Sequence, residues 1–486
     1  MRLSLAIALL AACLVGIPAE AASKPNFVFF LVDDLGWTDL GCCGSTFYET
    51  SNVDRLAATG MRFTNAYASS PVCSPTRASI LTGKYPNRVR VTMAVSPTGK
   101  YSPENWRRRT LMLPASMRDR LFLEEVTVAE ALKQAGYATF FAGKWHLGPR
   151  GFWPENQGFD INRGGHHAGG PFWGKHYFSP YGNPCLKDGP DGEHLPARLA
   201  TETVKFIEEH RDDPFLAYLS FYSVHTPLMA RQDLREKYQS KRESVAHDGP
   251  RWGKERQRKV RLIHDHAVYA GMVEAMDQAV GRVLDALDRL GLAENTIVIF
   301  TSDNGGLSTS EGHPTSNLPL RAGKGWLYEG GIREPMIVRW PGVTQPNSVC
   351  DAAVISMDFY PTILEMAGLA PRPGQHVDGR SIAPLLRGER REQRPLFWHF
   401  PHYANQGGAP AAAVRDGDWK LIEWYEDGSL ELFNLSDDPG EKNNLAEVKP
   451  EVRNSLHRKL DAWRKSVDVW MPTHRALDDP LRPKGR

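Results

Sequence analysis

The chain has 486 residues, of which 41% are hydrophobic and 24% are charged. These proportions are typical of a globular protein that buries a sizeable core, and they exclude a disordered chain or a single small module. The 59 lysine and arginine residues nearly balance the 57 aspartate and glutamate residues, so the formal net charge is only +2. This balance excludes a protein whose main partner is nucleic acid, because such proteins carry an excess of basic residues.

The N-terminal segment is typical of an export signal. Arg2 supplies a positive charge, residues 3–17 are apolar, and residues 19–21 (AEA) resemble a cleavage site. We therefore predict a signal peptide over residues 1–21 and a periplasmic or secreted protein. Lipoprotein anchoring at Cys13 is the less favoured alternative, because more apolar residues follow this cysteine. We expect no membrane span, since no segment reaches the roughly 20 apolar residues that a spanning helix needs.

Four short apolar runs are typical of strands that are buried on both faces, as in a parallel sheet. They cover residues 26–32, 138–142, 215–221 and 296–301. Helical signals precede three of these runs. The predicted helices cover residues 128–135, 197–210 and 269–290. This alternation predicts an α/β fold with a doubly wound, mostly parallel sheet and helices on both faces.

Polar residues directly follow all four apolar runs. They are Asp33, Asp34, Lys144, His146, His225, Asp303 and Asn304. Any one of these endings can be ordinary turn chemistry, and a hairpin turn at residues 303–305 is one such alternative. Doubly wound sheets bind ligands beyond the carboxyl ends of their strands. Four polar endings together therefore favour one convergent site.

The sequence pattern changes after about residue 390. Short alternating segments between residues 397 and 433, with Asp-Gly turns, predict a small antiparallel sheet. Residues 451–467 then have a helical pattern. We therefore predict a large domain over residues 24–390, which carries the candidate site, and a small C-terminal α+β subdomain with a tail over residues 395–486.

Residues 71–83 (PVCSPTRASILTG) contain a cysteine in an unusual setting. Pro75 suits the first turn of a helix, so Cys73 would lie at a helix N-terminus, where backbone amides and the helix dipole favour an anion. Arg77 adds a permanent positive charge. This setting suits a reactive thiolate or a bound oxyanion, whereas a buried structural cysteine fits poorly beside proline and arginine.

With Cys-x-Pro-x-Arg followed by Leu-Thr-Gly, the chain resembles the sulfatase family. The resemblance includes Asp33-Asp34, residues 136–146 (GYATFFAGKWH) and the stretch 431–441, so it spans nearly the whole exported chain. It implies the alkaline-phosphatase-like fold and the hydrolysis of sulfate esters by an arylsulfatase-type enzyme. It also implies that a maturation enzyme oxidises Cys73 to formylglycine. The hydrate of this aldehyde would attack sulfur, and elimination would then release the sulfate.

The resemblance implies one bound Ca²⁺ per chain. Its ligands would be Asp33, Asp34, Asp303, Asn304 and the formylglycine made from Cys73. Carboxylate and amide oxygens are the hard donors that Ca²⁺ prefers. Paired carboxylates on adjacent strands also repel each other, and a bound cation relieves this repulsion.

The candidate catalytic residues are Cys73, Arg77, Lys144, His146, His225 and Lys324. Lys144 and His146 flank Trp145, which places both on one side of an extended segment. The resemblance assigns charge stabilisation to Lys144, and to His146 the orientation or deprotonation of the diol. It implies that His225 contacts the sulfate and acts as the general acid, and that Lys324 grips the sulfate. Each residue alone would more often be a solvated or core side chain.

A sulfated polysaccharide or oligosaccharide is the favoured substrate class. The chain lacks the apolar hairpin of membrane-inserted steroid sulfatases, and aromatic residues within 170–181 can stack on sugar faces. Candidate substrate contacts are His166, His167 and His313; a transition-metal site at the adjacent pair is less favoured. One alternative function is a phosphodiesterase or phosphonate hydrolase of the same fold, which would use a Ser or Thr nucleophile and paired zinc ions. Another is a non-catalytic carbohydrate-binding relative, which would have lost the nucleophile or the cation ligands.

Overall fold

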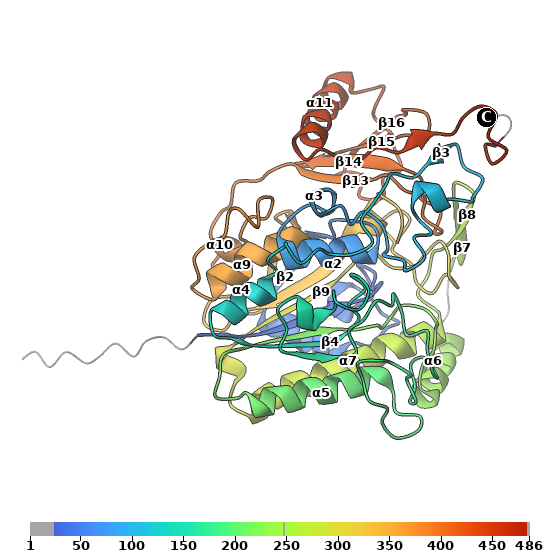
Figure 1. Cartoon of the computed structure of the whole chain (residues 1–486). Coiled ribbons are helices and arrows are strands. Elements are labelled where there is room, and N and C mark those ends of the chain that lie inside the picture. The colour runs from blue at the N-terminus through green and yellow to red at the C-terminus, as the bar shows by residue number, and fades with distance from the viewer. Residues whose placement is uncertain (1–23, 246–247, 484–486) are drawn as a thin grey trace, which may run out of the picture.

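The computed structural model describes residues 24–245 and 248–483, so the predicted signal peptide and Cys13 lie outside the described residues. A large mixed sheet has helices on both faces, and a smaller antiparallel sheet with one helix forms the C-terminal end (Figure 1). In the described part of the chain, no helix has the length and apolarity needed to cross a membrane.

The large sheet has nine strands in the order β11-β2-β10-β9-β1-β6-β4-β5, and β12 also pairs with β2. Its strands are β1 (Asn26–Val32), β2 (Met61–Tyr67), β4 (Ala138–Gly143), β5 (Ile161–Arg163), β6 (Phe215–Ser220), β9 (Thr296–Ser302), β10 (Arg333–Arg339), β11 (Ser348–Cys350) and β12 (Val354–Ile355). The predicted strands β9, β1, β6 and β4 are adjacent and parallel. Within the described residues of this sheet, only β10 runs antiparallel to its neighbours, so the predicted doubly wound, mostly parallel sheet is confirmed.

Alternate side chains of the central strand β1 build two separate cores. Val28, Phe30 and Val32 pack with α1, α5 and α7, whereas Phe27 and Phe29 pack on the opposite face with α2, α4 and α9. This division follows from the two-residue period of a strand that is covered on both sides. The helices are α1 (Ser51–Thr59), α2 (Cys73–Thr82), α3 (Pro86–Val89), α4 (Val128–Gln134), α5 (Leu195–Glu209), α6 (Gln232–Ser244), α7 (Ala267–Arg289), α8 (Glu329–Ile332), α9 (Phe359–Met366), α10 (Ala383–Leu386) and α11 (Pro450–Ser466).

Local sequence signals explain where the predicted helices begin and end. The Thr127 side chain accepts a hydrogen bond from the Glu130 backbone amide, and the Glu130 side chain accepts one from the Thr127 amide, which is the capping box that opens α4. Gly136 follows this helix with a positive φ of 84°. The apolar residues at spacings of three and four form the buried face of α7, the longest of the helices in the described residues.

The C-terminal strands β13 (Leu396–Phe400), β14 (Ala411–Asp416), β15 (Trp419–Trp424) and β16 (Leu430–Asn434) form an antiparallel meander. Helix α11 packs against it and contributes Leu456, Leu460 and Trp463 to a third core. Two small sheets also occur. They pair β3 (Met112–Leu113) with β17 (Thr473–His474), and β7 (Trp252–Glu255) with β8 (Arg258–Arg261).

A buried ionic network joins the C-terminal sheet to the large domain. We call it the Lys420 cluster; its members are Lys420, Glu329, Glu441 and Tyr67. The Lys420 ammonium lies 2.9 Å from Glu329 Oε1 and 2.8 Å from Glu441 Oε1. The Glu329 amide donates to Glu441 Oε2 at 2.6 Å, and the Tyr67 hydroxyl donates to Glu329 Oε2 at 2.6 Å. The network fixes α8, which directly follows the loop that carries Lys324.

Candidate active site

The last residues of four neighbouring parallel strands lie side by side. Val32 of β1 pairs with Ser302 of β9, and Ser220 of β6 pairs with Gly143 of β4. Every polar residue predicted at these strand ends therefore lies at the same edge of the sheet. Gly143 permits this arrangement, because its φ is +99° and a Cβ atom there would lie 1.8 Å from the Ser220 carbonyl oxygen.

Cys73 is the first residue of α2 and is buried beside these strand ends. Its Sγ lies 3.3 Å from His146 Nδ1. The Ser74 hydroxyl donates to the His146 carbonyl at 2.9 Å and so ties the helix start to the segment after β4. Burial raises the pKa of the Cys73 thiol. The unmodified cysteine therefore does not readily form a thiolate, although it lies at the N-terminus of α2 and near the ammonium groups of Lys144 and Lys324.

Arg77 connects the strand ends. Its Nε and Nη2 lie 2.8 and 2.7 Å from Asp303 Oδ2. Its Nη1 donates to the Lys144 carbonyl at 2.7 Å and to Ser220 Oγ at 2.6 Å. Despite burial, which opposes the charged form, the Asp303 carboxylate raises the pKa of the Arg77 guanidinium. Arg77 therefore stabilises the arrangement of β4, β6 and β9, one helical turn behind Cys73.

Two lysines form ion pairs with the two adjacent carboxylates that directly follow β1. Lys144 Nζ lies 2.6 Å from Asp33 Oδ2, and Lys324 Nζ lies 2.7 Å from Asp34 Oδ1. Burial alone would raise both carboxyl pKa values. The Lys324 ammonium overcomes this effect at Asp34 and lowers its pKa to about 2, whereas the pKa of Asp33 stays well above its ordinary value. The Asn304 side-chain amide also donates to Asp34 Oδ1 at 2.7 Å.

Among the predicted cation ligands, two buried oxygens have no hydrogen-bond partner in the described residues: Asp33 Oδ1 and Asn304 Oδ1. Buried polar atoms are almost always paired, so these two oxygens are candidate ligand atoms. The nearby Asp303 Oδ1 has only a long contact of 3.3 Å with the Asp34 amide. Carboxylate and amide oxygens in this arrangement fit a hard divalent cation such as Ca²⁺. Asp33 and Asp34 also form, with His225, a group whose donor atoms lie within 4.8 Å of one another.

The hydrogen bonds of the two buried histidines define their tautomers. His146 Nε2 lies 2.9 Å from the Val95 carbonyl, so Nε2 carries the proton and Nδ1 presents a lone pair to Cys73. His225 Nδ1 likewise donates to the Thr226 carbonyl at 2.8 Å, which leaves Nε2 unprotonated. Burial and the nearby lysines hold the pKa of both imidazoles well below 6.5, so both are neutral at pH 7.

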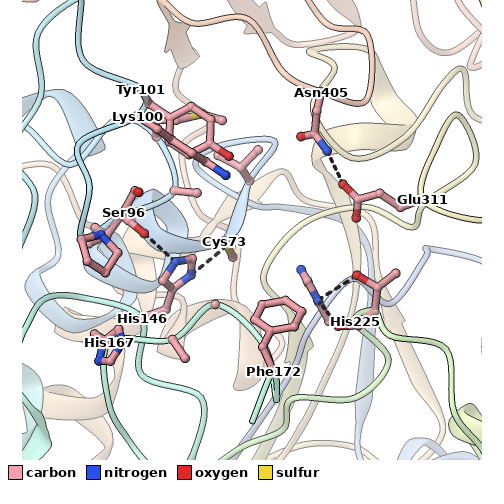
Figure 2. A pocket seen from close by; sticks show the side chains of 18 of the residues that line it. Cys73, Ser96, Lys100, Tyr101, His146, His167, Phe172, His225, Glu311 and Asn405 are labelled. Atoms are coloured by element: carbon pink, nitrogen blue, oxygen red, sulfur yellow. Dashed lines mark hydrogen bonds between the residues drawn. The ribbon is translucent and has the colours of Figure 1, made fainter. Parts of the chain in front are cut away.

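A cavity of about 410 Å³ lies directly over Cys73. Figure 2 shows His146 and His225, which both line it, on either side of Cys73. Lys324 also lines it, whereas Arg77 does not. The cavity therefore exposes the cysteine, two neutral histidines and one ammonium to a ligand.

The three histidines predicted as substrate contacts lie in different places. His167 lines the cavity. His166 is buried, and its ring centroid lies 4.8 Å from that of Trp173. His313 stacks edge-on against Trp252 with ring centroids 5.7 Å apart, and it does not line the cavity. Of the three, only His167 can touch a ligand in the cavity as it is shaped here.

Several cavity residues were not found from the sequence. They are Ser96, Lys100, Tyr101, Glu311, Asn405 and Gln406. All lie in loops without hydrophobic periodicity, and two come from the C-terminal part of the chain. The aromatic segment at 170–181, which the sequence did single out, contributes the half-exposed Trp173 and the exposed Phe172.

Residues 25–369 match the family model described as sulfatase. The chain belongs to the sulfatase family. Residues 322–466 also match the model of the C-terminal region of N-sulphoglucosamine sulphohydrolase. The sulfatase match spans both the Cys73 motif and the strand ends that surround it.

Relatives of this sulfatase are similar over most of their length. A sulfatase of Formosa agariphila is 36% identical, with 91% of this chain and 89% of that protein covered. N-acetylgalactosamine-6-sulfatase of Canis lupus familiaris is 32% identical, with 91% and 80% covered. The crystal structure of Ps i-CgsB in complex with k-i-k-neocarrahexaose superimposes with a TM-score of 0.74 at 26% identity and covers 94% of this chain and 97% of that chain. This sulfatase therefore has the alkaline-phosphatase-like fold, and it is a sulfuric ester hydrolase.

Proposed function

We propose that this sulfatase hydrolyses sulfate esters of carbohydrates with a formylglycine made from Cys73 and a bound Ca²⁺. The observation that carries the proposal is that Cys73 lies at the start of α2 and lines the same cavity as His146, His225 and Lys324. A helix N-terminus and an ammonium attract the sulfate, His146 accepts a proton, and His225 supplies one after it has itself been protonated. A Ser or Thr nucleophile with paired zinc ions, as in the rival phosphatase-type function, has no counterpart at this position.

In this proposal Asp33, Asp34, Asp303 and Asn304 hold the Ca²⁺. The two unpartnered oxygens, Asp33 Oδ1 and Asn304 Oδ1, support this assignment, because a cation would satisfy both. When bound, the ion neutralises negative charge that gathers on the sulfate oxygens. Arg77 keeps Asp303 in position and leaves its Oδ1 free for a ligand.

The two histidines carry out the proton transfers. His146 Nδ1 points at the reacting position of Cys73 and accepts the proton of the attacking hydroxyl group. His225 Nε2 faces Asp34 Oδ2 at 3.9 Å. The negative charge of a bound sulfate favours protonation of His225, which then donates to the leaving oxygen. Lys324 and Lys144 offset the charge that develops on the sulfate.

A sulfated polysaccharide or oligosaccharide is the proposed substrate. Phe172 and Trp173 are 51% and 38% exposed and line the cavity, so they can stack on sugar rings. The names of the N-acetylgalactosamine-6-sulfatase relative and of the oligosaccharide complex support the same class. We further infer export through the signal peptide at residues 1–21, a maturation enzyme that oxidises Cys73, and a division into a domain at residues 24–390 and a subdomain at residues 395–486.

The proposal is tested by measuring sulfate release from a panel of glycosaminoglycan and algal oligosaccharides, with 4-nitrophenyl sulfate as the reference. We expect turnover of at least one sugar sulfate with a kcat/KM above that for the aryl ester. Turnover of aryl sulfates alone, with every sugar sulfate untouched, would contradict the carbohydrate assignment and leave the sulfatase chemistry intact.

A further inference from the structure

Glu311 is a carboxylate in the wall of a cavity that must receive an anion. It lies in the loop between β9 and α8, and it lines the cavity together with Cys73 and Lys324. Figure 2 shows Glu311 and Asn405 on one side of Cys73, and Lys100 and Tyr101 on the other. The two walls therefore carry opposite charges.

The chain holds this carboxylate firmly. Its Oε1 accepts hydrogen bonds from the Asn405 side-chain amide and, at 2.7 Å, from Gln406 Nε2. Gln406 is buried, and Thr309 Oγ1 and Trp326 Nε1 donate to its backbone carbonyl at 3.0 and 3.2 Å. Two segments that lie about ninety positions apart in the sequence thus meet to orient one side chain.

The backbone at Glu311 is also unusual. Its φ is +52°, a left-handed conformation that costs conformational energy in any residue with a Cβ atom. Strain of this kind persists where the surrounding structure enforces it, and it is concentrated at functional sites. The two amides that bind Oε1 hold the side chain of this residue in place.

The negative charge of Glu311 works against sulfate binding. It adds to the Asp34 carboxylate in raising the pKa of Lys324, against the opposing effect of burial, so it partly offsets the attraction of this ammonium for an anion. Lys324 already has Asp34 as a partner at 2.7 Å, so Glu311 is not needed to neutralise it. A carboxylate that weakens sulfate attraction must make a compensating contact.

The free oxygen of Glu311 indicates what that contact is. Both hydrogen bonds of this carboxylate in the described residues go to Oε1, which leaves Oε2 without one, and the half-buried side chain lies at the cavity surface. An ionised carboxylate only accepts hydrogen bonds, so its partner must be a donor. In a sulfated sugar the donors next to the sulfate are uncharged hydroxyl groups, and a hydrogen bond from a hydroxyl to a carboxylate is a strong one.

We propose that Glu311 is a specificity-determining residue that accepts hydrogen bonds from free hydroxyl groups of the sulfated sugar ring. The cavity then favours a ring with unmodified hydroxyl groups on the side of Asn405, and it disfavours a ring with a second sulfate or carboxylate there, because that group would meet the Glu311 charge. Asn405 and Gln406 act as positioning residues. This inference rests on the proposed carbohydrate sulfatase function.

The test compares Glu311→Gln with the wild type on two kinds of substrate. For the best sugar sulfate of the panel we expect KM to rise so that kcat/KM falls about 10- to 100-fold, the loss expected for a hydrogen bond to a charged group. For 4-nitrophenyl sulfate, which has no sugar hydroxyl, we expect KM to stay the same or fall, because a repulsive charge is removed. Glu392→Gln, an exposed glutamate outside the cavity, is the matched control and should change neither.

Two further measurements test the hydrogen bond to Glu311 and the positioning role of Asn405. A deoxy analogue of the sugar sulfate, lacking the hydroxyl group that Glu311 binds, should lose activity with the wild type and lose nothing further with Glu311→Gln. Asn405→Ala should raise the sugar KM by a smaller factor, with the melting temperature of each variant measured to confirm folding.

Equal loss on sugar and aryl substrates, or no loss on either, would overturn the role of Glu311 and would leave the proposed function standing. A wild type that releases sulfate from no sugar in the panel would overturn both. These outcomes are therefore distinguishable by the wild-type kinetics alone.

Discussion

Residues 321–332 take part in two buried networks of charged residues, the Lys420 cluster and the network at the strand ends. The two networks differ in whether every side-chain oxygen has a partner within the protein. In the Lys420 cluster, each carboxylate oxygen of Glu329 and Glu441 lies within 2.9 Å of an ammonium, a hydroxyl group or a backbone amide. At the strand ends, Asp33 Oδ1 and Asn304 Oδ1 have no partner in the described part of the chain. In the first network the Lys420 ammonium lies 2.8 Å from Glu441 Oε1, the one carboxylate oxygen of that cluster without a hydrogen bond among the described residues. In the second network the proposed cation would be the partner of the two open oxygens.

This difference separates a structural role from a chemical one, although both networks contain a fully buried lysine. Lys420 connects two carboxylates across the interface between the C-terminal sheet and the large domain. Lys144 and Lys324 pair with carboxylates whose neighbouring oxygens are open. Burial of a charged group therefore does not identify a site. What distinguishes the strand ends is that two predicted cation ligands there, Asp33 and Asn304, each keep an unpartnered oxygen.

The largest effect is expected from Cys73→Ala, which leaves both networks intact. Turnover of 4-nitrophenyl sulfate should fall by about 10⁴-fold or more, because the nucleophile is lost. The melting temperature should stay close to that of the wild type. Cys350→Ala, a free and half-buried cysteine outside the site, is the control and should keep full activity. Substantial activity of Cys73→Ala would show that the nucleophile lies elsewhere.

Removal of the cation tests whether the open network needs a ligand. Dialysis against a calcium chelator should abolish activity and lower the melting temperature, because Asp33 and Asp303 lose a shared partner. Added Ca²⁺ should restore both properties better than Zn²⁺, since all the protein ligands proposed for the ion are oxygens. Metal analysis checks the assignment directly. An active preparation with stoichiometric zinc and no calcium would contradict it.

A lysine-to-methionine substitution should mainly lower stability in the Lys420 cluster and mainly lower activity at the strand ends. Lys420→Met removes the ammonium that two buried carboxylates share and should lower the free energy of unfolding by about 3–5 kcal/mol. Lys144→Met removes the buried ammonium that pairs with Asp33 and should lower kcat by roughly 10²- to 10³-fold, because less positive charge then offsets the charge on the sulfate. Its loss of stability should be smaller in Ca²⁺, because the ion compensates Asp33. Urea unfolding and steady-state kinetics measure both variants, and equal stability losses would erase the distinction between the networks.

The smallest effect is a shift in the pH dependence. Burial and the Lys144 charge hold the pKa of His146 well below its ordinary value of 6.5. The neutral imidazole that accepts the proton is thus present at pH 6.5 and is lost only as the pH falls through this lowered pKa. The acid limb of kcat/KM for an aryl sulfate should therefore lie below pH 6.5. A limb at or above pH 6.5 would mean that His146 is not the base.

The central fold was predictable because its strands are buried on both faces. Apolar runs such as residues 26–32, separated by helical periods, dictate a parallel sheet, and parallel strands bring their carboxyl ends to one edge. The position of β10 was not predictable in this way. It runs antiparallel between β2 and β9, and its pairing depends on contacts that are distant in sequence.

The site residues at the strand ends were predictable from the sequence, whereas the residues in the wall of the cavity were not. Asp33, Lys144 and Asp303 are placed by strand ends, which a local pattern reveals. Glu311 and Asn405 lie in loops with no such pattern, and they meet only because the C-terminal part packs on the large domain. Substrate recognition is thus encoded in tertiary contacts, whereas the chemistry is encoded in motifs.

The most direct test of the account is the chemical state of Cys73. Protein produced together with a formylglycine-generating enzyme should be digested with trypsin, and the peptide covering residues 63–77 (FTNAYASSPVCSPTR) should be examined by mass spectrometry. We expect an aldehyde oxygen in place of the sulfur of Cys73, in proportion to activity. Fully active protein with an unmodified Cys73 would contradict it.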